Sequence, residues 1–276
     1  MVDLDLKRKN LIAMAILENK SVTIGGGHWY TRDGVPAYTM KKKDGGDRLT
    51  NLRDARKHHL VPSVTTVFGI MSKPALDRWK TMKTIDAALA TPRKDGEDDK
   101  DYYDRILLRS NEETSEAADL GTRIHDAIDQ SFDGIPIPED LMKYVSPTML
   151  YLHDLKLENI VREKVVVNQA EGYGGRVDLL ANYGKGNIII DFKTRKSKPN
   201  QKMLPYDFQP TQIAAYAMAA FGTLDKCWGA NLYISTTEEG RIETCVYNPD
   251  QLKKEYEIFL SMASLWRYIK GYDPRS

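Results

Sequence analysis

The sequence predicts an α/β protein in which a central mixed β-sheet is flanked by helices. Residues 172–194 alternate apolar and polar side chains on both sides of a glycine-rich turn, as the two strands of a hairpin do. Segments with strand character alternate along the chain with segments of helical periodicity. The further strands are expected at 160–168, 227–235 and 242–247, and the amphipathic helices at 112–132, 209–221 and 249–270.

The N-terminal part is predicted to form a separate region. We divide the chain into residues 1–110, with a small aromatic hairpin and helices, and residues 111–276, with the sheet. Ser63 is suited to cap a short helix. The remaining expected elements are helices at 4–18, 73–89, 138–145 and 147–157, with a break at Ser146 before Pro147, and a surface loop at 91–101.

Composition limits the classes of function. The 276 residues carry a formal net charge of +1, which excludes a uniformly basic nucleic-acid binder. Contacts with phosphate must therefore come from local clusters. The basic runs 7–9 and 41–43 have the character of solvated charge runs, whereas the run 193–198 flanks an acidic stretch and favours a functional role.

Two cysteines, Cys227 and Cys245, are the whole cysteine content. Their number and spacing argue for a reducing compartment and against structural zinc. No apolar run approaches the ~18 residues of a membrane span, and the first residues do not form a targeting signal. The sequence therefore predicts a cytoplasmic protein without a membrane partner.

Acidic residues mark the hairpin as a candidate site. Asp191 and Lys193 share one strand face, and Asp178 lies on the preceding strand, 13 residues before Asp191, where pairing would bring the carboxylates together. Two carboxylates beside an ammonium suit a hard divalent cation. The alternative is a surface ion pair. Asp191 follows the apolar run 188–190, however, and a charge at the end of a buried strand needs a partner.

Other polar residues have two interpretations. His125 shares an apolar helix face with Ile124 and Ile128, so it is either a packed core histidine or a ligand. Gln212 and Tyr216 share a helix face that would otherwise only pack. Glu163 could reach the site, although a surface position is the expected one. The aromatic residues of segment 22–40 could stack bases or pack on the body of the protein.

Four short motifs in order resemble the RecB-like branch of the PD-(D/E)XK nuclease superfamily. They are Gly121 to His125, Gly175 to Asp178, Asp191 to Thr194 and Gln212 to Tyr216. A softer similarity, over residues 61–67 and 73–79, is to the mitochondrial genome maintenance exonucleases and their bacteriophage relatives.

The resemblance implies a restriction-endonuclease-like core that holds one or two Mg²⁺ or Mn²⁺ ions. By analogy, His125, Asp178, Asp191 and the carbonyl of Phe192 would bind metal, and Lys193 would complete the catalytic set with the two aspartates. Some RecB-like nucleases carry an iron-sulfur cluster on four cysteines, which this chain cannot supply. Contacts with nucleic acid are expected from Gln212, Tyr216, Arg176, Thr194, Arg195, Lys196 and Lys198.

The function implied is a metal-dependent deoxyribonuclease. The relatives favour an exonuclease on single-stranded DNA or DNA ends, active in replication, recombination or repair within a bacterial or phage-infected cell, with protein partners from those processes. The N-terminal region would form part of a DNA passage. A structure-specific endonuclease and a non-catalytic DNA-end-binding module on a nuclease fold are the alternatives.

Overall fold

The computed structural model describes residues 27–206 and 208–275, so the expected helix at 4–18 and the basic run 7–9 lie outside the described residues. The chain forms two compact units, one of residues up to Ile70 together with His125 onward, and one of Met71–Ile124. This division differs from the expected boundary at residue 110. The reason is that segment 27–70 packs on the sheet: Ser63 bridges to Gly174 of a central strand.

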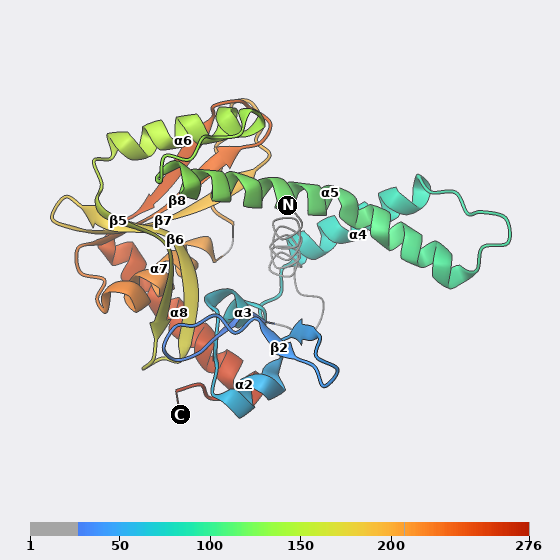
Figure 1. Ribbon diagram of the computed structural model, residues 1–276, viewed down its shortest axis with the longest axis horizontal. Coiled ribbons are helices and arrows are strands. Elements are labelled where there is room, and N and C mark those ends of the chain that lie inside the picture. The colour runs from blue at the N-terminus through green and yellow to red at the C-terminus, as the bar shows by residue number, and fades with distance from the viewer. Residues whose placement is uncertain (1–26, 207, 276) are drawn as a thin grey trace. The chain divides into compact units, whose positions relative to one another are not determined.

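A five-stranded mixed sheet forms the centre of the first unit (Figure 1). Its order is β5-β6-β7-β8-β9; the pair β7 and β8 is parallel, and the other neighbours are antiparallel. Helix α7 makes the crossover between the parallel strands. The bounds are β5 (Glu158–Asn168), β6 (Tyr173–Tyr183), β7 (Gly186–Arg195), α7 (Gln209–Phe221), β8 (Cys227–Ser235), β9 (Ile242–Tyr247) and α8 (Pro249–Lys270).

One face of the sheet is covered by α7 and α8. A Cβ added at Gly229 of β8 would lie 2.3 Å from Ile213 of α7 and 3.2 Å from Leu252 of α8, so only glycine allows this close packing. Residues 189, 191 and 193 of β7 share this face, because they are in register with residues 229, 231 and 233 of β8.

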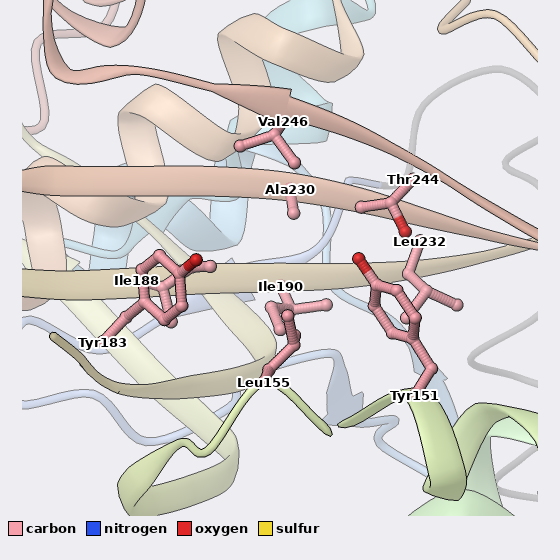
Figure 2. Close-up of a pocket in the computed structure, with 9 residues that line it drawn as sticks. All are labelled: Tyr151, Leu155, Tyr183, Ile188, Ile190, Ala230, Leu232, Thr244 and Val246. Atoms are coloured by element: carbon pink, nitrogen blue, oxygen red, sulfur yellow. The ribbon is translucent and has the colours of Figure 1, made fainter. Parts of the chain in front are cut away.

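The opposite face meets α6 (Met142–Asp154). Tyr151 and Leu155 point toward the sheet there and close an apolar cavity (Figure 2). Its other lining residues are Tyr183, Ile188, Ile190, Ala230, Leu232, Thr244 and Val246. Odd and even residues of β7 therefore face different helices, which confirms the alternation read from the sequence.

Helix α6 is continuous, whereas the sequence predicted two pieces that break before Pro147. Proline has no N–H, so it cannot hydrogen-bond to the carbonyl of Lys143 within the helix. The backbone N–H of Gly240, in the turn between β8 and β9, donates to that carbonyl instead, at 3.3 Å. A tertiary contact thus satisfies the group that proline leaves without a partner.

The N-terminal segment of the first unit contains short elements. Strands β1 (Trp29–Tyr30) and β4 (Val61–Pro62) pair, as do β2 (Thr39–Lys41) and β3 (Asp47–Leu49). Helices α2 (Leu52–His58) and α3 (Val64–Phe68) follow, the second capped by Ser63 as expected. The rings of Trp29 and Tyr30 are buried, so packing is the correct interpretation for these two aromatic residues.

The second unit is a helical hairpin of α4 (Pro74–Leu89) and the first part of α5 (Asp99–Ser131). Helix α5 starts well before the expected residue 112. Asp98 caps it, since its carboxylate accepts from the backbone N–H of Asp101 at 2.8 Å. The acidic cluster that suggested a loop instead stabilises a helix N-terminus. None of the described helices is long and apolar enough to cross a membrane.

Candidate functional site

Strands β6 and β7 separate at the predicted acidic residues. Their ladder runs from Tyr183 paired with Gly186 to Leu179 paired with Ile190, and ends there. Asp178 and Asp191 are the next residues on the two strands. The carboxylate Oδ2 of Asp178 accepts from the backbone N–H of Phe192 at 2.8 Å, in the place of a backbone carbonyl. Both carboxylates thus lie at the fork of the hairpin.

Asp191 is buried, with 3% of its surface exposed. Its Oδ2 forms an ion pair with Lys193 and accepts from Nδ2 of Asn231 at 3.0 Å. Tyr247 of β9 donates to Oδ1 of Asn231 at 2.8 Å, which fixes the orientation of that amide. These contacts supply the partners that a buried carboxylate requires.

Burial raises the pKa of Asp191, the nearby charge of Lys193 opposes the shift, and the charge of Asp178 adds to it. Burial favours the neutral form of Lys193, but the two carboxylates outweigh it and raise the pKa of the ammonium. Lys193 therefore remains protonated near neutral pH and acts as a fixed positive charge at the fork.

Helix α5 brings His125 to the same place. Its Nδ1 lies 3.8 Å from Oδ2 of Asp178, and its ring packs edge-on against Phe192, with centroids 5.9 Å apart. The side chain is 27% exposed, so it lies at the edge of the site rather than in the core. A small cavity at the fork is lined in part by His125, Glu163, Asp178 and Phe192.

Glu163 was expected at the surface, but the structure places it beside Asp178. Its neighbours Arg162 and Lys164 pair with Leu179 and Val177, so Glu163 lies opposite Asp178 on β5. Its φ of +48° is rare for a residue with a side chain. Nothing in the sequence signals such a backbone irregularity.

The environment of Glu163 favours its protonated form. Burial raises its pKa to about 7, with the charge of Arg176 opposing and that of Asp178 adding. Nε of Arg176 lies 3.0 Å from its carboxylate. A carboxyl whose pKa is raised to about 7 beside another acid is typical of functional sites.

The residues at the fork have the donor atoms for a hard divalent cation. Two ligands of one such ion lie about 3–4 Å apart, which matches the gap between His125 and Asp178. The N–H and C=O of one strand residue point to the same side, so the carbonyl of Phe192 also faces the fork. Within residues 27–206 and 208–275, however, no three His, Cys, Asp or Glu side chains are already gathered as a metal cluster. Oδ2 of Asp191 is held by Lys193 and Asn231, so Oδ1 is the oxygen of this carboxylate that is available to a metal ion.

Gln212 and Tyr216 share a face of α7, as predicted. Nε2 of Gln212 donates to the hydroxyl of Tyr216 at 2.9 Å. A Cβ at Gly175 of β6 would lie 2.3 Å from the Tyr216 ring, so glycine is required where the ring meets the strand. Burial raises the pKa of Tyr216, the hydrogen bond from Gln212 opposes the shift, and the charges of Asp191 and Asp178 add to it.

The basic residues expected to bind nucleic acid are used in different ways. Lys196 and Lys198 are exposed, and Thr194 is half-buried at the end of β7. Arg176 is exposed but is paired with Glu163. Arg195 instead donates to the carbonyl of Leu204 at 2.7 Å, and its guanidinium is committed to the protein itself.

No protein-family model matches the chain, and no curated protein matches it. Fifteen chains of solved structures match, among them one described as "Crystal structure of SSO0001". It shares 17% identity with a TM-score of 0.30, over 71% of this chain and 87% of that one. A score this low carries no argument about fold family or function.

Proposed function

We propose that this protein is a metal-dependent deoxyribonuclease with a PD-(D/E)XK-like core. The observation that carries the proposal is the convergence of Asp178, Asp191, Lys193 and His125 at the fork of the hairpin. Helix α5, which supplies His125, is distant in sequence from the hairpin that supplies the other three residues. Two carboxylates, an imidazole and a protonated lysine are the groups that metal-assisted hydrolysis of a phosphodiester needs.

Each side chain has a defined task. His125, Asp178, Asp191 and the carbonyl of Phe192 would hold Mg²⁺ or Mn²⁺, which when bound polarises the phosphate and increases the acidity of a coordinated water. Lys193 is protonated, so it stabilises the negative charge that develops on the phosphoryl oxygens rather than acting as a base. Asn231 keeps Asp191 in place through its amide.

The softer similarity to the mitochondrial genome maintenance exonucleases and their bacteriophage relatives supports an exonuclease acting on single-stranded DNA or DNA ends. The test is incubation of end-labelled linear and circular single-stranded DNA, duplex DNA and RNA with Mg²⁺ or Mn²⁺. We expect loss of linear DNA while the circle persists. Asp191→Ala and Lys193→Ala should abolish digestion, and Lys185→Ala, at the far turn of the hairpin, should not. Wild-type rates in Lys193→Ala would refute the assignment, and cleavage of the circle would indicate an endonuclease.

A non-catalytic DNA-end-binding module is the second candidate. The observation in its favour is the contact of Asp191 with Lys193 and Asn231, which occupies one of the two carboxylate oxygens. Binding of DNA ends by the wild type, with no digestion in either metal, would support this candidate over the enzyme.

A further inference from the structure

Arg195 lies two residues after Lys193 on the same face of β7, yet its cation is directed into the protein. Its guanidinium lies 4.1 Å from the centroid of the Tyr206 ring and 5.6 Å from that of Tyr233. It also donates to the hydroxyl of Tyr206 at 2.8 Å and to the carbonyl of Leu204. Arg195 therefore fixes the loop after β7 and supports one aromatic ring in particular.

Tyr206 is held at its backbone as well. Its N–H donates to Oε1 of Gln209 at 2.9 Å, and the same oxygen accepts from the hydroxyl of Tyr233 at 2.7 Å. Tyr233 is in register with Lys193. Tyr206 is thus connected, through Gln209 and Tyr233, to the strand position next to the proposed catalytic lysine.

The held ring is nevertheless open to solvent. Tyr206 is 62% exposed, as is the neighbouring Leu204. An exposed tyrosine ordinarily gains little from being fixed, because its rotamer entropy is lost without burial. A ring that is positioned by a cation, a hydroxyl contact and a backbone contact is preorganised to receive a flat partner.

The loop that carries the ring has a charge that suits a polyanion. Lys196, Lys198 and Lys202 belong to the same loop, and all three are exposed. Sites for single-stranded nucleic acid combine such a basic border with an aromatic side chain on which a base stacks. Residues two apart on a strand are about 7 Å apart, so Arg195, which holds the ring, closely follows Lys193 on the same face.

We propose that Tyr206 is a stacking platform for a nucleobase of a single-stranded substrate close to the reacting phosphate, with Arg195 as its support. The inference rests on the proposed function and adds a subsite to it. The phosphate is held by the fork, and the base rests on the ring. Stacking does not depend on base identity, so the subsite accepts any sequence.

The test measures the binding of a fluorescently labelled oligo(dT) strand by fluorescence anisotropy. EDTA is present so that no cleavage occurs. Tyr206→Ala should weaken binding about tenfold or more, and Tyr206→Trp should bind at least as well as the wild type. Tyr206→Phe keeps the ring face and should stay close to the wild type. Tyr206→Leu separates stacking from simple apolar contact and should bind like the alanine variant. Tyr268→Ala is the control, because that ring is 84% exposed on α8.

A second strand isolates the base. On an oligonucleotide of abasic sites, the wild type and Tyr206→Ala should bind equally, because no base is present to stack. Equal binding of oligo(dT) by these two proteins, or wild-type binding by Tyr206→Leu, would overturn the inference while leaving digestion by the wild type intact. A wild type that neither binds nor digests single strands would instead overturn the proposed function, and this subsite with it.

Discussion

Replacement of Glu163 by glutamine should stabilise the protein in a way that depends on pH. The folded state raises the pKa of this carboxyl from 4.5 to about 7, chiefly by burial. A raised pKa means that the folded state favours the proton. The stability linked to that proton is complete below about pH 4.5 and is lost as the pH rises through about 7. At higher pH the wild type carries a charge that the fold disfavours, whereas glutamine does not.

The structure sets the size of this effect. Each pKa unit corresponds to about 1.4 kcal/mol. The rise in the pKa of Glu163 from 4.5 to about 7 therefore corresponds to at most about 3.4 kcal/mol of stability. The side chain is 34% exposed and is paired with Arg176, so solvent screening reduces the expected gain to about 1–2 kcal/mol at pH 8.

Urea unfolding in EDTA at pH 5 and pH 8 measures the difference between Glu163→Gln and the wild type at each pH. We expect the free energy of unfolding of the variant, relative to that of the wild type, to be higher at pH 8 than at pH 5. Glu158→Gln changes an exposed glutamate of the same strand and is the matched control. A stability difference for Glu163→Gln that is the same at both pH values would refute the reasoning about its burial.

Three other predictions follow from single contacts. Mn²⁺ should raise the melting temperature of the wild type but not of Asp178→Asn, measured by differential scanning fluorimetry; an equal shift in both would place the ion elsewhere. Gly175→Ala should lower stability by about 1–3 kcal/mol because its Cβ meets the Tyr216 ring, whereas Gly46→Ala, with ordinary contacts, should lose far less in the same urea titration. Asp54→Asn should cost about 2 kcal/mol at pH 7 by weakening an ion pair and a helix cap. The arginine partner lowers the pKa of Asp54 to about 2, so that stability is lost as the pH falls and the cost should be smaller at pH 3.

Periodicity made the central elements predictable. The expected bounds of α7 and α8 agree with the structure, as do those of β8 and β9, because each has a clear apolar face and is bounded by turn residues. The hairpin was predicted for the same reason. The sequence does not show that β6 and β7 separate at the acids, because that depends on the carboxylate of Asp178 taking the place of a backbone acceptor.

The site was predictable only where a side chain follows a regular backbone. Asp191 and Lys193 lie where strand alternation puts them. Glu163 escaped the prediction because its position opposite Asp178 depends on how β5 pairs with β6, and Arg195 because its partners come from a loop about ten residues later. The same applies to α6, where Gly240 satisfies the carbonyl that a proline exposes. Long-range hydrogen bonds leave no local pattern in a sequence.

The hydrogen bond from Tyr247 to Asn231 has a consequence beyond local packing. A phenol that donates to the amide oxygen obliges the NH₂ group to face Asp191. Without that hydroxyl, the carboxamide is free to turn over and present its oxygen to a carboxylate, which repels it. Tyr247, on the outermost strand, thereby determines which end of the Asn231 amide faces Asp191, two strands away. Phenylalanine at position 247 would change the hydrogen bonding of Asp191 without contacting it.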